Sequence, residues 1–277
     1  MVQEESMTRS LPSVSVVVPN LNQGHFLEEA LLSIISQPNL DIRIAVMDAG
    51  STDGSLSIIK KYEQHITHWR SHPDNGQAAA INEGVKILPP SDYVCWLNAD
   101  DTYLEHGLIK MVEYLEINKQ CAAVYSQAYI TDSNNHILSE YPTVNFSVKQ
   151  LSRSCIICQP ATLIRQSAWE NSNGINASLH MCMDYDLWWR LLKQGEIGYL
   201  DVFTACSRDH EGTKTRNNKE QHYKEAFNLL KKHNGYVPWS WCMSRVIETQ
   251  IERRNIFSKI GIKLKAAYYF LGFKYIK

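Results

Sequence analysis

The 277-residue sequence lacks several features that would assign it to a specialised class of protein. It contains no apolar run of the roughly 18 residues that a membrane-spanning helix needs, and residues 1–10 include no apolar segment typical of a signal peptide. We therefore expect a cytoplasmic protein. The formal net charge of −1 shows no excess of positive charge, so we expect no nucleic-acid partner.

Two nucleotide-binding motifs are also absent. No Gly-x-Gly-x-x-Gly follows the first β-branched run, and no Gly-x-x-x-x-Gly-Lys-Ser/Thr occurs anywhere in the chain. This excludes a dinucleotide site of the usual kind and a P-loop. The seven cysteines are odd in number and scattered, so they predict no disulfide framework and fit a reducing compartment. Cys155 and Cys158 form one Cys-x-x-Cys without a second pair, which we interpret as core cysteines.

The sequence does contain an alternating pattern of strands and helices. Hydrophobic residues make up 44% and charged residues 21% of the chain, which is typical of a globular protein with one main core. The patterns predict strands over residues 13–19, 42–48, 66–69, 93–97 and 122–128, and helices over residues 24–36, 55–62 and 78–88. This alternation predicts an α/β fold with a mostly parallel central sheet flanked by helices.

Polar residues follow each predicted strand of this half, in residues 19–22, 48–51, 74–77 and 98–101. Because ligands of open α/β sheets bind beyond the carboxyl ends of the strands, we expect these four segments to line one crevice. The carboxylates of Asp100 and Asp101 suit a hard divalent cation that carries a diphosphate. The alternative is that one of them caps a helix beginning near Leu104.

These motifs, in this order, resemble the nucleotide half of a family 2 glycosyltransferase with the Rossmann-like GT-A fold, of the type found in bacterial polysaccharide biosynthesis. The motifs that carry the resemblance are the strand from Val14 to Pro19, Asp48-Ala49-Gly50-Ser51-Thr52-Asp53-Gly54 and Asn98-Ala99-Asp100-Asp101. The resemblance implies a nucleotide-binding half over residues 11–101 and an acceptor half over 102–215. It also implies a donor-nucleotide site formed by Pro19, Leu21, Asp48, Asp74, Gly76, Gln77 and Asn98. Asn98 stands where many relatives have an aspartate.

The second half of the chain supports the same resemblance. Residues 158–162 resemble the acceptor-side segment of the family, and residues 176–191 are similar to its acidic motif followed by an aromatic helix. Asp184 matches the general base of that motif, although it could instead be a helix N-cap. His210 matches an imidazole that many members offer to the metal, although a lone histidine is often structural. The resemblance thus implies Mg²⁺ or Mn²⁺ bound by Asp100 and His210.

The chain changes character after the region of resemblance. Residues 211–218 are predicted to form either a lid over the site or an ordinary solvated loop. Residues 216–277 are predicted to be a helical extension, whose last part, residues 253–277, has seven Lys or Arg residues and no acid among apolar residues. We interpret that part as a basic amphipathic segment that binds an anionic membrane surface on the inner face of the cell membrane, or that packs on the domain.

These observations predict an inverting glycosyltransferase. It would transfer a sugar from a nucleotide diphospho-sugar, with a UDP-sugar favoured, to a hydroxyl of a glycan or lipid-linked acceptor. A divalent cation at Asp100 would stabilise the leaving diphosphate, and Asp184 would act as general base. Two alternatives remain open at this point, namely a nucleotidyltransferase that forms a sugar nucleotide and a catalytically silent carbohydrate-binding protein with the same fold.

Overall fold

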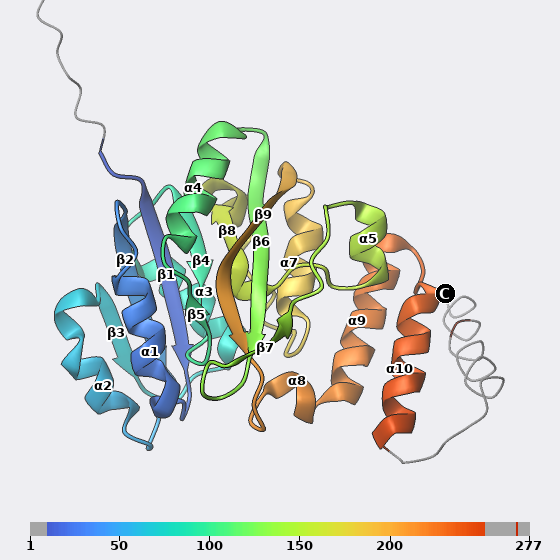
Figure 1. Cartoon of the computed structure of the whole chain (residues 1–277), viewed down its shortest axis with the longest axis horizontal. Helices are drawn as coiled ribbons and strands as arrows, with labels where there is room; N and C mark the ends of the chain where they lie inside the picture. The colour runs from blue at the N-terminus through green and yellow to red at the C-terminus, as the bar shows by residue number, and fades with distance from the viewer. Residues whose placement is uncertain (1–9, 253–269, 271–277) are drawn as a thin grey trace, which may run out of the picture.

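The N-terminal half of the chain forms the parallel sheet that its alternating pattern predicts (Figure 1). The computed structural model describes residues 10–252 and residue 270. In spatial order, the first strands are β3 (His68–Ser71), β2 (Asp41–Asp48), β1 (Ser13–Asn20) and β4 (Tyr93–Trp96). They are connected by α1 (Gly24–Ile35), α2 (Ser55–Lys61), the short η1 (Glu63–His65) and α3 (Gln77–Ile87). Every residue of β1 is buried, since this strand lies between β2 and β4.

The sheet continues into the second half with mixed strand directions. Beyond β4 follow β8 (Thr162–Arg165), β6 (Cys121–Thr131), β9 (Glu196–Arg208) and β5 (Thr102–Tyr103), and β7 (Ile137–Glu140) pairs with β6. Of these contacts, only β6 with β9 is parallel. The connecting helices are α4 (Gly107–Ile117), α5 (Val148–Arg153), η2 (Gln159–Ala161), α6 (Gln166–Asn171), α7 (Met183–Leu191) and α8 (Lys214–Asn217). The pattern of the sequence predicted only part of β6 among these strands.

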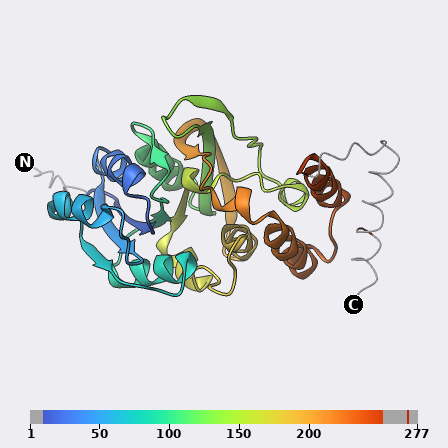
Figure 2. The ribbon, with the colours of Figure 1, turned by 90° about the horizontal axis from the view of Figure 1, so that it is seen from below.

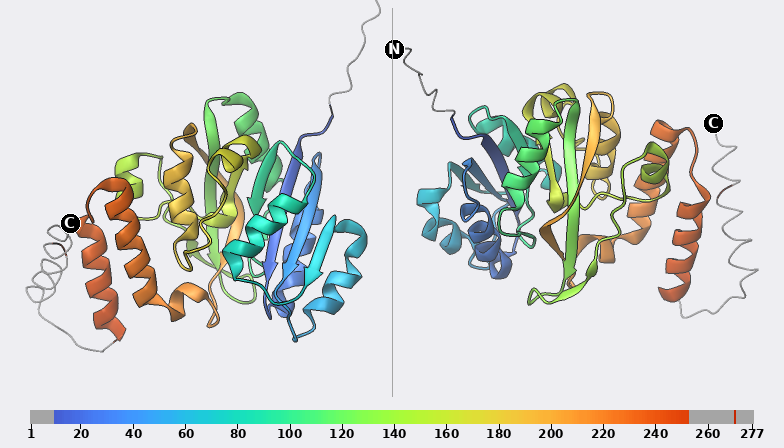
Figure 3. Two further views of the ribbon diagram at one scale, coloured as in Figure 1. Left: turned by 180° about the vertical axis from the view of Figure 1, so that it is seen from behind. Right: turned by 45° about the horizontal axis from the view of Figure 1, so that its top comes forward.

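Helices cover both faces of the sheet, so alternate side chains of β1 enter different cores. Val14, Val16 and Val18 pack with α1 and α4 on one face. Val17 packs on the other face, where α3, α6 and α7 lie (Figure 3). The period of two in a strand places neighbouring residues on opposite faces, and a strand that is covered on both sides therefore needs a continuous apolar run. This three-layer arrangement confirms the predicted α/β class.

The two aspartates after β4 do not begin a helix. Asp100 and Asp101 are followed by β5, whose residues pair with Ala205 and Cys206 of β9, and α4 begins only at Gly107. The expected helix start near Leu104 is therefore wrong, because a long-range strand partner takes up the chain at this point. Capping of a helix does not explain the aspartate pair.

Two further helices extend the molecule beyond α7, namely α9 (Lys219–Asn234) and α10 (Trp239–Glu252), at the end opposite the first strands (Figure 2). They are not a separate body. Their apolar side chains share one core with those of α7, and they include Tyr223, Phe227, Leu230, Trp241, Cys242 and Val246. These two helices lie within the range 216–277 that the sequence predicts to be a helical extension, and they pack on the second half of the domain.

The predicted basic segment over residues 253–277 lies outside the described residues, except for Phe270. The Phe270 ring packs on the same core as α9 and α10, with its centroid 5.8 Å from that of Trp239. Among the described residues, no helix is both long and apolar enough to span a membrane.

Candidate active site

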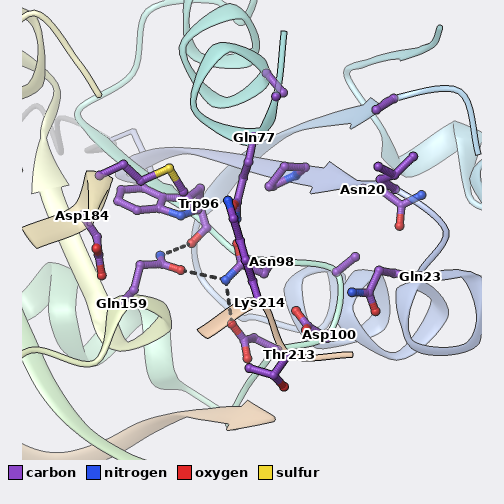
Figure 4. A pocket seen from close by; sticks show the side chains of 18 of the residues that line it. Asn20, Gln23, Gln77, Trp96, Asn98, Asp100, Gln159, Asp184, Thr213 and Lys214 are labelled. Atoms are coloured by element: carbon purple, nitrogen blue, oxygen red, sulfur yellow. Dashed lines mark hydrogen bonds between the residues drawn. The ribbon is translucent and has the colours of Figure 1, made fainter. Parts of the chain in front are cut away.

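A pocket of about 520 Å³ lies at the carboxyl ends of β1 and β4, where it is walled by residues of both halves of the chain (Figure 4). Most of the residues predicted from the sequence line it, namely Pro19, Leu21, Asp74, Gly76, Gln77, Asn98, Asp100 and Asp184. Residues without such a prediction also line it, among them Asn20, Gln23, Trp96, Gln159, His180, Thr213 and Lys214. The predicted single crevice is therefore present in the fold.

Asp48 is the predicted nucleotide-binding residue that does not line this pocket. Its carboxylate is fully buried and accepts hydrogen bonds from the Asn20 amide at 2.6 Å, from Ser71 Oγ at 2.5 Å and from the backbone of Ser51 at 2.9 Å. Burial alone would raise the pKa of Asp48, but the hydrogen bonds from Ser51, Ser71 and Asn20 outweigh it and lower the pKa. In the structure Asp48 thus shapes the loop that follows β2.

Asp74 holds the turn that leads into α3. Its carboxylate accepts a hydrogen bond from Arg70 at 3.1 Å, and Arg70 is itself paired with Glu83 at 2.9 Å. The other oxygen of Asp74 accepts from the Gly76 amide at 2.8 Å. Gly76 has a φ of +96°, a conformation that a residue with a side chain rarely adopts. These contacts place Gln77 at the first position of α3, at the edge of the pocket.

A chain of side-chain amides crosses the pocket (Figure 4). Gln77 Nε2 donates to Asn98 Oδ1 at 2.7 Å, and Asn98 Nδ2 donates to Asp101 Oδ2 at 3.0 Å and to Gln159 Oε1 at 3.3 Å. Gln159 Nε2 in turn donates to the carbonyl of Trp96 at 2.8 Å. Gln159 lies within the predicted acceptor-side segment, but a lone glutamine gives no separate signal in the sequence.

The two aspartates of the pair have different roles. Asp101 is buried and accepts a hydrogen bond from the Arg208 amide at 3.0 Å, and burial together with the charge of Asp100 raises its pKa to about 8. Asp100 lines the pocket, and its Oδ2 lies 3.0 Å from His210 Nε2. The structure therefore brings together the two predicted metal ligands, which are separated by 110 positions in the chain.

A carboxylate oxygen beside an imidazole nitrogen is a donor set that fits Mn²⁺ or Mg²⁺. The second ring nitrogen of His210, Nδ1, lies 3.1 Å from the amide of Gly212, which leaves Nε2 directed at Asp100. Among residues 10–252 and 270, no group of three or more His, Cys, Asp or Glu side chains is arranged as a complete metal site. A cation here would need further oxygen ligands from a bound molecule or from water.

Asp184 lies on the side of the pocket opposite Asp100, with Asn98 and Gln77 between them in the view of Figure 4. It lies in the first turn of α7, whose N-cap is Cys182, so the N-cap alternative for Asp184 is wrong. Burial raises the pKa of the Asp184 carboxyl, although hydrogen bonding to the Tyr185 amide and the charge of Lys214 oppose this shift. A carboxylate that is poorly solvated and faces a pocket is a candidate proton acceptor.

Lys214 is the cation that sequence reasoning did not single out. It follows the strand β9, within the predicted lid of residues 211–218, and its Nζ donates to Gln77 Oε1 at 3.3 Å. Burial lowers the pKa of Lys214, and the charges of Glu225 and Asp184 oppose this. Gly212, Thr213 and Lys214 all line the pocket. The segment therefore forms part of the pocket wall, and its motion as a lid stays a prediction.

Comparisons with known proteins extend this description. Chondroitin synthase of Pasteurella multocida strain Pm70 is 27% identical over 203 residues, which represent 72% of this chain and 21% of that protein. An uncharacterized glycosyltransferase of Rickettsia typhi is 26% identical over 232 residues, 80% of this chain and 72% of that protein. The chain thus spans only about a fifth of the length of the synthase.

Solved structures share the fold at low sequence identity. Staphylococcus aureus TarS in complex with UDP-GlcNAc superposes with a TM-score of 0.61 at 16% identity, and the match covers 94% of this chain and 71% of that one. The mannosyltransferase PcManGT of Pyrobaculum calidifontis, in complex with GDP-Man and Mn²⁺, gives 0.61 at 15% identity over 94% and 87% of the two chains. These matches confirm the predicted GT-A fold.

The model of the family described as glycosyl transferase family 2 matches residues 15–171. This range includes most of the strand β1, the loop after Asp48 and the aspartate pair, and it ends before Asp184 and His210. It covers more than half of the 277 residues, and the resemblance seen in the sequence motifs is thereby confirmed: the chain belongs to glycosyl transferase family 2.

Proposed function

We propose that this chain catalyses an inverting glycosyl transfer from a nucleotide diphospho-sugar to a hydroxyl group of a glycan or lipid-linked acceptor. The observation that carries the proposal is the arrangement of one pocket, with Asp100, which contacts His210, on one side and Asp184 on the other. This arrangement separates a position for the leaving diphosphate from a position for the attacking hydroxyl. Such a separation suits attack on the anomeric carbon from the face opposite the leaving group.

Asp100 and His210 would hold the divalent cation, with phosphate oxygens of the donor and water as its further ligands. The cation would stabilise the negative charge that grows on the diphosphate as the anomeric C–O bond breaks. The buried Asp101 supports this wall, since its carboxylate orients the amide of Asn98 and the backbone of Arg208.

Asp184 would accept the proton of the acceptor hydroxyl as its oxygen forms the new bond to the anomeric carbon. The bond to the diphosphate breaks in the same step, so the configuration inverts and no covalent enzyme intermediate forms. The raised pKa of Asp184 makes the carboxylate a stronger base than an exposed aspartate. The positive charge of Lys214 acts in the opposite direction and lowers the pKa of Asp184.

Water must be kept out, because it competes with the acceptor as nucleophile. Gly212, Thr213 and Lys214 line the pocket on the segment after β9, so closure of residues 211–218 over a bound donor is part of the proposal. A UDP-sugar is the donor we favour, and the TarS structure that shares this fold contains UDP-GlcNAc. A GDP-sugar is the competing donor, since the PcManGT structure contains GDP-Man and Mn²⁺.

The alternative of a catalytically silent carbohydrate-binding protein rests on the residue Asn98, which stands where many relatives have an aspartate. Its amide is engaged with Gln77, Asp101 and Gln159. Multiple turnovers with a donor and an acceptor would exclude this alternative. The nucleotidyltransferase alternative has less support, because the loop that follows β1, residues 19–24, contains no Lys or Arg.

The proposal also includes a place of action, at the inner face of the cell membrane. The seven cations in residues 253–277 would each contribute about 1 kcal/mol near an anionic surface. Sedimentation with anionic liposomes at low salt tests this, with neutral liposomes as the control. Failure of the full-length protein to sediment would contradict the membrane association and would leave the transferase proposal unaffected.

The decisive test of the transferase proposal is a thermal-shift screen against UDP-, GDP- and dTDP-sugars, each with and without Mn²⁺. A ligand that binds only the folded state raises the melting temperature by mass action. We expect one nucleotide class to raise it, and the rise to depend on Mn²⁺. The donor so identified is then incubated with candidate glycan acceptors, and the anomeric configuration of the product is determined by NMR. A product of retained configuration would contradict the inverting mechanism.

A further inference from the structure

The loop that leads to Asp184 is held by a carboxylate from a distant helix. Glu225, in α9, accepts hydrogen bonds from the backbone amides of Met181 at 2.8 Å, Cys182 at 3.1 Å and His180 at 3.2 Å. Its other oxygen accepts from the Gln221 side chain at 3.0 Å. One carboxylate thus satisfies three successive backbone donors that lie 43 to 45 positions earlier in the chain.

These three residues connect the pocket to the start of α7. His180 and Met181 line the pocket, and Cys182 is the N-cap of α7. The N-cap side chain makes no capping hydrogen bond of its own, although the first amides of a helix need acceptors. Glu225 accepts from the amide of the N-cap Cys182 itself and from the two amides before it, and its negative charge also interacts favourably with the positive end of the α7 dipole.

The helix that carries Glu225 is itself fixed to α7 at a second point. Asp186 of α7 is fully buried and lies 3.0 Å from His233 Nε2 and 3.4 Å from Lys232 Nζ, both near the end of α9. Arg190 completes the group, with its Nε 2.6 Å from Asp186. Because α9 is attached near its end and also packs through a shared core, Glu225 is presented to the loop by a rigid support.

We propose that Glu225 is a positioning residue for the proposed general base, because it fixes the backbone of residues 180–182 and thereby the first turn of α7, where Asp184 lies. This inference rests on the proposed role of Asp184. Three charge-assisted hydrogen bonds restrict the loop more strongly than neutral ones would. A base displaced by about 1 Å from its productive position can lose roughly two orders of magnitude in rate.

The test compares two changes at Glu225 with a matched change on the same helix. Glu225→Ala removes all the acceptors, and Glu225→Gln keeps one oxygen but places an amide group beside backbone donors. Glu220→Gln is the control, since this carboxylate is 92% exposed and its ion-pair contact is with Arg245 at 4.0 Å. We expect kcat to fall roughly 10- to 100-fold for Glu225→Ala, by less for Glu225→Gln, and to stay unchanged for Glu220→Gln. The donor KM should stay within a few-fold of wild type in all three variants.

Amide hydrogen exchange provides a second measurement that does not depend on activity. In Glu225→Ala, the amides of residues 180–184 should exchange faster, while those of β1 and α3 keep their protection. Unchanged exchange in residues 180–184 would overturn the inference. So would faster exchange with an unchanged kcat, because the restraint would then have no bearing on the base. If the wild-type enzyme transfers no sugar from any donor, the proposed function fails, whereas the exchange result still decides whether Glu225 holds the loop.

Discussion

The pocket has two walls that are built in different ways. The nucleotide wall includes Asp74, Asn98 and Asp100, and the opposite wall, the base wall, includes Asp184. On the nucleotide wall, the turn of Asp74 is held by near neighbours, since its carboxylate accepts hydrogen bonds from the Gly76 amide and from Arg70. Asn98 and Asp100 of the same wall also contact Gln159 and His210, which lie much farther along the chain. On the opposite wall, the loop before Asp184 depends on Glu225, which lies more than forty positions further along the chain. The nucleotide wall therefore combines local and long-range contacts, whereas the loop before Asp184 is held by a distant helix.

The family match covers the two walls unequally. The matched range of residues 15–171 contains the nucleotide wall almost completely but stops before α7 and α9. Local units keep their geometry wherever the sheet is formed. The position of Asp184 depends on the packing of α7 against α9 and α10. Many combinations of apolar residues can form such packed helices.

The largest effect is expected from a change that removes the proposed base, Asp184, and leaves the nucleotide wall intact. Asp184→Asn should lower kcat by roughly 10² to 10⁴, the scale of general-base removal, while donor affinity stays within a few-fold. Because burial raises the pKa of Asp184, its ionised form costs stability at neutral pH, so the variant should melt no lower than wild type. Steady-state kinetics, donor titration and thermal melts provide the three measurements. An active Asp184→Asn enzyme would end the assignment of the base.

The converse change weakens the nucleotide wall. Asp100→Ala should abolish the part of donor binding that depends on Mn²⁺, and His210→Ala should reduce it less, since water can replace one neutral ligand. Calorimetric titration of the donor with Mn²⁺ and with excess chelator measures both. Full activity of the wild-type enzyme in excess chelator would show that no cation is needed. The proposed role of Asp100 and His210 as metal ligands would then be wrong.

The support of the base wall can be tested through stability alone. Burial of Asp186 opposes its ionisation, but hydrogen bonding to His233 and the charge of Arg190 outweigh this and hold its pKa well below the usual range. Asp186→Asn leaves Arg190 and Lys232 without their buried anionic partner, so it should lower the free energy of unfolding by about 3 kcal/mol. Asp41→Asn, which breaks an exposed pair with Arg43, should cost less than about 1 kcal/mol. Urea unfolding at pH 7 compares the two variants.

The pH dependence of this contribution has a defined sign. Because the pKa of Asp186 is lower in the folded state than in the unfolded chain, its stabilisation is complete above pH of about 4 and declines as the pH falls further. The difference between wild type and Asp186→Asn should therefore shrink in acid. A difference that is equally large at pH 7 and pH 3 would mean that the ionised carboxylate is not its source.

The smallest expected effect concerns the electrostatics between the two walls. The base must be deprotonated, and burial raises the pKa of Asp184, so activity should fall with acid at a higher pH than that of an ordinary aspartate, about 4. Lys214→Gln removes the cation that opposes this shift, and the acid limb of kcat/KM should move to still higher pH. Arg216→Gln, which changes a cation paired with Asp209 on the same segment, should leave the limb in place. A shift of the acid limb toward lower pH in Lys214→Gln would contradict the electrostatic effect of Lys214 on Asp184.

Much of the nucleotide wall could be predicted because its signals are local. The β-branched run before Pro19 and the polar turns after Asp48 and Asp74 each indicate a strand end. Parallel strands bring those ends to one edge, and seven of the predicted donor and metal residues line the pocket: Pro19, Leu21, Asp74, Gly76, Gln77, Asn98 and Asp100. The prediction that Asp48 binds the nucleotide stays a prediction, and the pattern did not reveal that Asn20, Ser51 and Ser71 surround its carboxylate.

The sequence by itself determined the class of fold and the end of β4 where Asp100 faces the pocket, because both depend on short-range patterns of apolar and polar residues. The resemblance to family 2 glycosyltransferases supplied Asp184 as a candidate base. Only the tertiary structure decided that Asp101 is buried, that His210 reaches Asp100 and that Glu225 holds the loop before Asp184. Each of these contacts joins residues more than forty positions apart. Such contacts form only when strands and helices pack together, and a single sequence carries no local signal for the partner that packing supplies.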